Sequence, residues 1–179
     1  MKVFKFGGAS VKDSQGFLNV ENIVNHFRND KLAIVVSATG KTTNALEEVL
    51  KSYFQQDGKT AQLVEVVKQN HLNIIKGLGI EDNAAVNDLN DLFVEIDWVI
   101  EEAPKDDYDY VYDQVVSIGE LVSSKILYYT LQSKGHKVAW LDIRDVLFTD
   151  EIHREAKVLW HLSTDKINDK VHALLKEND

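Results

Sequence analysis

The sequence predicts an α/β protein with a mainly parallel sheet, and three observations lead to this prediction. A strand, a helix and a second strand fit into the first 36 residues, which is the pattern of a parallel βαβ unit. Helical periods then fill the middle of the chain, and a strand pattern returns near residue 137, as expected of an α/β protein. The 179 residues, of which 44% are hydrophobic and 27% charged, suffice for one globular domain.

Two apolar runs around an amphipathic segment define the first unit. Val3–Phe6 is rich in β-branched and aromatic residues and stops at a pair of glycines, as a strand does at a tight turn. From Ser14 the apolar residues recur at spacings of three and four, which predicts a helix capped by Asp13 or Ser14. Residues 32–36 are continuously apolar, which is typical of a strand buried on both faces.

Helical periods dominate between Asn44 and Gly135. Three apolar stripes predict three helices, the last of which should end at Pro104, the only proline. A fourth helix is predicted from Tyr108 to Ser133, and because it is apolar on most sides we expect it to be central and buried.

The last part of the chain is predicted to return to the sheet. Lys137–Leu141 follows Gly135 and reads as a third strand, and residues 156–162 fit a further short strand. A last helix, capped within residues 163–165, should extend to Leu175. Three strands make a small sheet for this number of helices.

Composition excludes several classes of function. Twenty Lys and Arg against 29 Asp and Glu give a net charge of −9, which opposes binding to nucleic acid or to an anionic membrane. Cysteine is absent and the six histidines are dispersed, so no thiolate chemistry and no metal site are expected. No signal peptide or membrane-spanning run is recognisable, and we expect a cytoplasmic protein.

The glycine pair after the first strand is the first candidate site. Backbone N–H groups at Gly7 and Gly8 can approach an anion, while Lys5 supplies a positive charge and Ser10 a hydroxyl. Phosphate is the natural ligand of such a segment. The alternative is an ordinary strand-to-helix turn beside a surface lysine, which the glycine pair alone favours.

Residues 37–44 form a second candidate, a hydroxyl-rich loop after a buried strand. Gly40-Lys41-Thr42 resembles the end of a P-loop, but that motif needs a glycine where Val35 stands, so the P-loop interpretation fails. The loop still lies at the carboxyl end of a strand, where open α/β sheets bind ligands. The alternative is simple helix capping by Thr42 or Thr43.

Two further candidates carry charge. Glu120 follows Gly119 on the apolar fourth helix, so it needs a partner and could hold an ammonium group, unless it reaches the surface or pairs with a lysine. Arg154 lies in a polar loop and could bind a carboxylate through its planar guanidinium. Taken alone, an exposed arginine beside Glu151 and Glu155 is the simpler interpretation.

In this order, the four segments resemble the aspartate kinases of the amino acid kinase family. Residues 5–11 are similar to that family's KFGG(T/S/A)SV signature, residues 35–44 to its VVSA…TN element, and residues 117–120 to its S-x-GE element. Residues 142–150 are similar to its DxRxV…T(D/N) segment. The resemblance implies a three-layer αβα sandwich of the amino acid kinase type.

The resemblance also implies a function, the transfer of the ATP γ-phosphoryl group to the side-chain carboxylate of L-aspartate. The product is 4-phospho-L-aspartate, a precursor of lysine, threonine and methionine, and the implied cofactors are ATP and Mg²⁺. The residues expected at the phosphates are Lys5, Gly7, Gly8 and Ser10, with Lys5 also catalytic. The residues expected to hold aspartate are Ser37, Thr43, Glu120 and Arg154.

Some features of the family are missing from the sequence. The family's arginine often stands six residues after its threonine, whereas Arg154 stands five after Thr149 and Glu155 takes the usual place. The downstream T-x-x-G-R-G-G-S-D segment of the nucleotide site and the regulatory ACT domains do not occur in residues 1–179. We therefore expect the N-terminal portion of a catalytic domain, inactive alone and prone to form a homo-oligomer through exposed sheet edges.

Two other functions remain open at this point. One is another small-molecule kinase of the same fold, with glutamate, carbamate or a nucleoside monophosphate as acceptor. The other is a noncatalytic binding or assembly module that keeps the fold without the chemistry.

Overall fold

Two parallel strands and the helix between them open the chain. The computed structural model describes residues 1–177, and β1 (Lys2–Phe6) pairs with β2 (Leu32–Val36) from Lys2↔Leu32 to Phe6↔Val36. Helix α1 (Ser14–His26) connects them, and the Asp13 carboxylate accepts a hydrogen bond from the Gly16 amide at its start. The predicted βαβ unit and its cap at Asp13 are confirmed.

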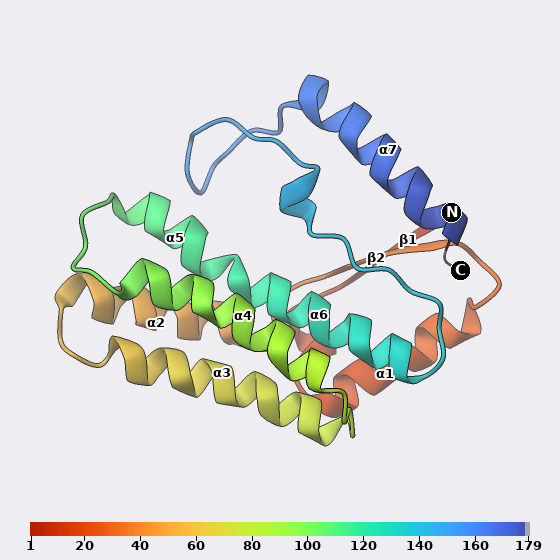
Figure 1. Cartoon of the computed structure of the whole chain (residues 1–179), viewed down its shortest axis with the longest axis horizontal. Coiled ribbons are helices and arrows are strands. Elements are labelled where there is room, and N and C mark those ends of the chain that lie inside the picture. The colour runs from red at the N-terminus through yellow and green to blue at the C-terminus, as the bar shows by residue number, and fades with distance from the viewer. Residues whose placement is uncertain (178–179) are drawn as a thin grey trace.

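Five helices form a layer beside this small sheet (Figure 1). The predicted stripes of the first three helices lie in α2, α3 and α4, and α4 ends before Pro104 as expected. The five helices are α2 (Thr42–Gln55), α3 (Thr60–Gly77), α4 (Asn83–Ile100), α5 (Tyr108–Val116) and α6 (Ile118–Ser133).

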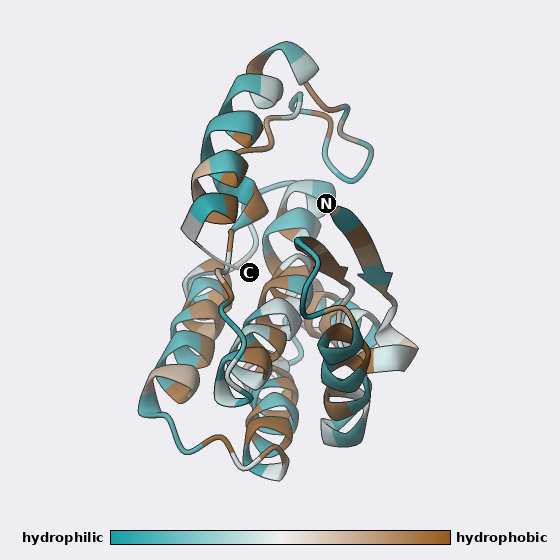
Figure 2. Cartoon of the chain, turned by 90° about the vertical axis from the view of Figure 1, so that its right-hand side faces the viewer, coloured by the Kyte–Doolittle hydropathy of each residue, from teal (hydrophilic) through white to brown (hydrophobic). Residues whose placement is uncertain are grey.

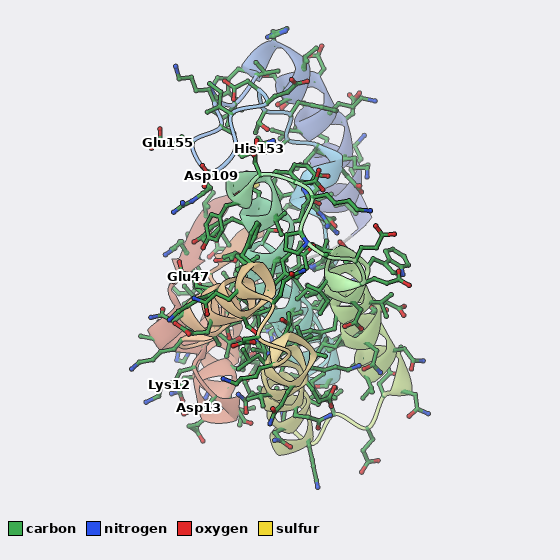
Figure 3. The ribbon with its side chains drawn as sticks, turned by 90° about the vertical axis from the view of Figure 1, so that its left-hand side faces the viewer. Lys12, Asp13, Glu47, Asp109, His153 and Glu155 are labelled. Atoms are coloured by element: carbon green, nitrogen blue, oxygen red, sulfur yellow. The ribbon has the colours of Figure 1, made fainter. Side chains whose placement is uncertain are left out.

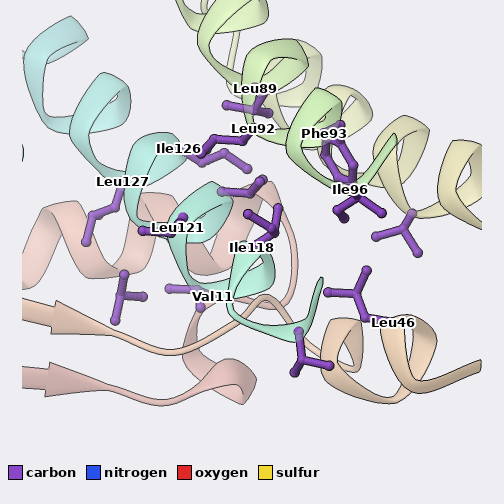
Figure 4. Packing of buried hydrophobic residues seen from close by; sticks show 14 of the residues in the cluster. Val11, Leu46, Leu89, Leu92, Phe93, Ile96, Ile118, Leu121, Ile126 and Leu127 are labelled. Atoms are coloured by element: carbon purple, nitrogen blue, oxygen red, sulfur yellow. The ribbon is translucent and has the colours of Figure 1, made fainter. Parts of the chain in front are cut away.

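The core lies where α6 meets α4 and α2. Figure 4 shows Phe93 and Ile96 of α4 beside Ile118 of α6, with Leu46 of α2 close by, and all four residues are buried. The prediction of one long helix over 108–133 is corrected, because Ser117 separates α5 from α6. The buried, central part of that segment is α6.

The sheet is less completely covered than the helical layer. Figure 2 shows β2 as an almost continuous hydrophobic ribbon. Phe4 packs edge-to-face on Phe27 at the end of α1, but Val3 and Val35 on the other face are 64% and 53% exposed. The α/β class and the parallel pairing are confirmed, and within residues 1–177 the sheet has two strands.

The predicted strand over residues 137–141 is wrong, because this segment is irregular and packs on α6 instead. The indole of Trp140 donates a hydrogen bond to Ser124 Oγ at 2.8 Å, and the Lys125 ammonium lies 3.8 Å from the centre of the Trp140 ring. The indole N–H of Trp140 thus has its hydrogen-bond partner on α6, and the ring packs against Lys125 of the same helix.

The segment over residues 156–162 is also not a strand. A single bridge joins Thr149 to Val158, and α7 (Trp160–Glu177) then begins before the predicted cap. Ser163 therefore lies inside the helix, where its hydroxyl accepts a hydrogen bond from the Phe148 amide at 2.9 Å. Polar residues make up most of α7 (Figure 2), which lies apart from the helical layer (Figure 1).

Candidate functional site

The first strand ends in a tight turn, as the sequence predicts. Gly7 continues in extended conformation after Phe6, and residues 8–11 form the 3₁₀ turn η1 (Gly8–Val11). The Ser10 amide closes the turn with a 2.8 Å hydrogen bond to the Gly7 carbonyl.

Gly8 brings this turn against the loop that follows β2. A Cβ atom on Gly8 would stand 2.6 Å from the Ala38 carbonyl oxygen and 3.1 Å from that of Gly40. The Gly40 amide also donates a 3.1 Å hydrogen bond to the Gly8 carbonyl, and the Ser37 amide a 3.0 Å bond to that of Phe6. Only glycine allows backbones to approach this closely, so the first two candidate segments form one structure.

Lys5 lies beside this turn with its ammonium group available. Its side chain is exposed, and Nζ is 3.8 Å from the point where a Cβ on Gly7 would stand. Among residues 1–177 it forms no ion pair. Ser10 is also exposed and lines a pocket of about 410 Å³ next to α1. The turn therefore presents a free cation and a hydroxyl at one strand end.

Glu120 lies next to the same loop, on the first turn of α6. Its Oε1 accepts a 3.4 Å hydrogen bond from the Ala38 amide, and the positive end of the helix dipole favours a carboxylate there. In the described part of the chain no lysine or arginine pairs with it. The alternative of a lysine-paired glutamate is therefore wrong, and the carboxylate is half-buried with capacity for a cationic partner.

Gly119 explains how α6 approaches so closely. A Cβ atom on Gly119 would stand 3.1 Å from the Thr42 methyl carbon and 3.3 Å from the Ala38 methyl carbon. Ser37 and Thr43, both half-buried, flank these contact residues in the sequence. Gly8 after β1, Ala38 in the loop after β2 and the first turn of α6 therefore meet in one place.

Arg154 lies elsewhere, at the tip of the loop that the Thr149–Val158 bridge closes. Its Nη1 donates to Asp109 Oδ1 at 3.1 Å, its guanidinium lies 4.3 Å from the centre of the Tyr112 ring, and its amide donates to Asp113 at 2.8 Å. The hydrogen bond that Arg154 donates to Asp109 raises the pKa of Arg154 further above its ordinary value. The expected neighbours Glu151 and Glu155 do not supply its ion pair.

The structure thus connects Arg154 to the other candidates only indirectly. The Tyr112 hydroxyl beneath it donates a 2.9 Å hydrogen bond to Glu47, which lies on α2 one turn beyond Thr43. Figure 3 shows Asp109, His153 and Glu155 in the upper half of the view, Lys12 in the lower half, and Glu47 between them. In this conformation the Arg154 guanidinium is paired with Asp109 of α5.

Sequence reasoning missed a buried pair close to the site. His71 of α3 lies 3.2 Å from the Thr42 hydroxyl, and burial lowers the pKa of its imidazole below 6.5. Its position inside an apolar stripe was the available signal, since a histidine there needs hydrogen-bond partners. The hydroxyl of Thr39 is also buried, and no group in residues 1–177 bonds to it.

Two kinds of site find no support in the described residues. Residues 1–177 contain no group of three or more His, Asp or Glu side chains placed to hold a metal ion. None of the helices in this range has both the length and the apolar character needed to cross a membrane.

Comparisons with known proteins find aspartokinases among the relatives of this chain. Bifunctional aspartokinase/homoserine dehydrogenase 2 of Escherichia coli (strain K12) is 33% identical over 153 residues, which cover 82% of this chain and 18% of that protein. Aspartokinase 2, chloroplastic, of Arabidopsis thaliana is 28% identical over 151 residues, or 82% of this chain and 27% of that protein. The chain thus spans less than a third of the length of either relative.

Solved structures show the same fold. E. coli aspartokinase III, crystallised in complex with aspartate and ADP, superposes with a TM-score of 0.86 at 23% identity, over 98% of this chain and 38% of that one. At this identity the likeness concerns the fold. Residues 1–176 match the sequence profile described as the Amino acid kinase family. A match of this extent establishes that the chain belongs to the amino acid kinase family.

Proposed function

We propose that this chain forms the amino-acid-binding part of an aspartate kinase, which transfers the ATP γ-phosphoryl group to the side-chain carboxylate of L-aspartate. One observation carries the proposal. The Glu120 carboxylate has no ion-pair partner among the described residues and accepts a hydrogen bond from the Ala38 amide, and the Ala38 carbonyl lies against Gly8 of the lysine-glycine turn. The relatives named aspartokinases, and the neighbour whose structure contains aspartate and ADP, support the same acceptor.

In the proposed reaction the glycine turn holds the phosphates. Backbone N–H groups of Gly7 and Gly8 and the hydroxyl of Ser10 donate to phosphate oxygens, and Lys5 neutralises charge on the transferring group. A carboxylate nucleophile is already ionised near neutral pH, so no general base is required. Mg²⁺ would be held mainly by the ATP phosphates and water, as is usual for this ion in ATP-dependent phosphoryl transfer.

At the acceptor end, Glu120 pairs with the ammonium group of aspartate. Ser37 and Thr43 donate hydroxyl hydrogen bonds to its carboxylates, and the half-buried setting strengthens both kinds of contact. Arg154 reaches a substrate carboxylate only after it exchanges its ion pair with Asp109. That exchange weakens its net contribution, because one carboxylate replaces another.

The proposal also covers the extent of the catalytic domain, its self-association and its location in the cell. Residues 1–179 correspond to the N-terminal portion of the catalytic domain, and we expect this chain alone to bind substrate without turnover. The apolar residues exposed on the sheet, Val3 and Val35, favour self-association into a homo-oligomer. The proposed location is the cytoplasm, which supplies both ATP and free amino acids.

Calorimetric titration of the chain with L-aspartate and L-glutamate tests the proposal. We expect saturable binding of L-aspartate that weakens about tenfold or more in Glu120→Gln, because the ammonium partner is lost in a partly desolvated site. Glu48→Gln is the matched control, since the Glu48 side chain is 64% exposed. Equal binding of both amino acids would point to another acceptor, and undiminished binding by Glu120→Gln would refute the proposed role of Glu120.

A further inference from the structure

His71 is enclosed in the helical layer, with only 1% of its surface exposed. Its Nδ1 lies 2.7 Å from the Val67 carbonyl oxygen. A carbonyl can only accept, so Nδ1 carries the proton and Nε2 of the neutral ring is an acceptor. Nε2 faces the Thr42 hydroxyl at 3.2 Å, and Thr42 therefore donates to His71.

Thr42 belongs to two contacts at once. Its hydroxyl is bound to α3 through His71, while its methyl carbon lies 3.1 Å from the position of a Cβ on Gly119. It occupies the first turn of α2, and Gly119 occupies the first turn of α6. One side chain thus holds the beginnings of two helices against each other.

These two helix beginnings carry the proposed aspartate ligands. Thr43 follows Thr42 on α2, and Glu120 follows Gly119 on α6. A change in the rotamer of Thr42, or in its position relative to α6, would therefore alter the distance between Thr43 and Glu120. The tilted ring of Phe93, 6.0 Å from the imidazole between ring centres, restricts the movement of His71.

We propose that His71 is a positioning residue for the amino-acid site. Its hydrogen bond to Thr42 fixes the first turn of α2 against the first turn of α6, and so sets the spacing of the acceptor ligands. This inference rests on the proposed function for the identity of the ligand, but the spacing itself is a property of the free chain.

Two pairs of variants separate the hydrogen bond from simple filling of space. His71→Gln keeps an acceptor near the Nε2 position, whereas His71→Phe keeps a ring without one. Thr42→Ser keeps the donor, whereas Thr42→Val keeps the branched shape without the donor. His161→Gln is the control on exposed α7, and urea unfolding confirms that each variant is folded.

Titration with L-aspartate gives the first readout. We expect His71→Phe and Thr42→Val to bind roughly tenfold more weakly, since each leaves a buried polar atom unpaired and the helix ends shift to relieve it. The variants that keep the bond should stay within about threefold of the original chain. Original affinity in both His71→Phe and Thr42→Val would overturn the proposal.

Amide NMR signals of the free chain give a second readout that does not depend on the ligand. In His71→Phe we expect the signals of Thr43 and Glu120 to move, and in His71→Gln to stay close to their original positions. If the original chain binds no L-aspartate, the proposed acceptor fails while this readout still decides the positioning role. Unmoved Thr43 and Glu120 signals in His71→Phe would overturn it.

Discussion

Residues up to His136 and residues 137–177 differ in how their apolar side chains are used. In the first region Phe93, Ile118 and Ile126 are almost completely buried in one core. In the second, Ile143, Trp160 and Leu162 are exposed, and the contacts of α7 include exposed ion pairs such as Lys170–Asp145. Burial therefore makes the first region the stable support of the site, and the second region an attached segment.

The largest predicted effect contrasts a core residue with an exposed one on the same helix. Phe93→Ala should lower the free energy of unfolding by about 3–5 kcal/mol, because it leaves a cavity in the core. Trp98 is 71% exposed on α4, and Trp98→Ala should change this free energy by less than about 0.5 kcal/mol. Urea unfolding measures both, and similar losses would contradict the assigned core.

A second contrast concerns the two adjacent glycines of the site. Gly8→Ala places a methyl group 2.6 Å from a backbone oxygen and should cost about 1–3 kcal/mol of stability. Gly7→Ala meets only the end of the Lys5 side chain at 3.8 Å and should be nearly neutral. Thermal unfolding of the two variants checks this, and equal stabilities would mean that the two loops do not touch as described.

The third prediction is a pH dependence that originates at His71. Burial lowers its pKa in the folded state below the ordinary 6.5, so as pH falls below 6.5 the unfolded chain takes up a proton that the folded chain refuses. Stability from this site is complete above 6.5 and is lost as pH falls toward the folded-state pKa, at no more than about 1.4 kcal/mol per pH unit. His71→Gln should lack this slope.

The measurement is the difference in unfolding free energy between the original chain and His71→Gln from pH 7.5 down to about pH 5. Taking the difference removes the titration of the carboxylates that both chains share. A difference that stays constant over this range would show that His71 is accessible to protons in the folded state.

The smallest predicted effect lies in the attached segment. Lys170 and Asp145 form a 2.8 Å ion pair between half-exposed side chains, and such pairs contribute little. Lys170→Ala should lower the free energy of unfolding by at most about 0.5 kcal/mol, while amide exchange in α7 becomes faster. A loss as large as that of Phe93→Ala would mean that residues 137–177 belong to the cooperative core.

The contrast between the buried first region and residues 137–177 also explains which elements the sequence could predict. The stripes of α2, α3 and α4 report local periodicity and are confirmed, because each helix buries its own apolar face. The strand expected at 137–141 is wrong, because this segment is irregular and packs on α6, where the Trp140 indole donates a hydrogen bond to Ser124. Periodicity contains no information on such distant partners.

The candidate site also contains contacts that the sequence pattern could predict and contacts that it could not. Strand ends that share one edge of a parallel sheet are expected to be neighbours, so the convergence of Gly8 with Ala38 follows from the βαβ pattern. The pairing of Arg154 with Asp109 and the bond between His71 and Thr42 join segments far apart in the sequence. Nothing in the local pattern of either segment indicates those partners.

The most direct test of the central claim is to map the amide NMR shifts that L-aspartate causes in the chain. The account predicts changes concentrated at Gly7–Ser10, at residues 37–43 and at residues 117–121, with α7 unaffected. Changes centred instead on the pocket between Trp140 and Lys170, or none at saturating L-aspartate, would contradict the claim that these three segments form one acceptor site.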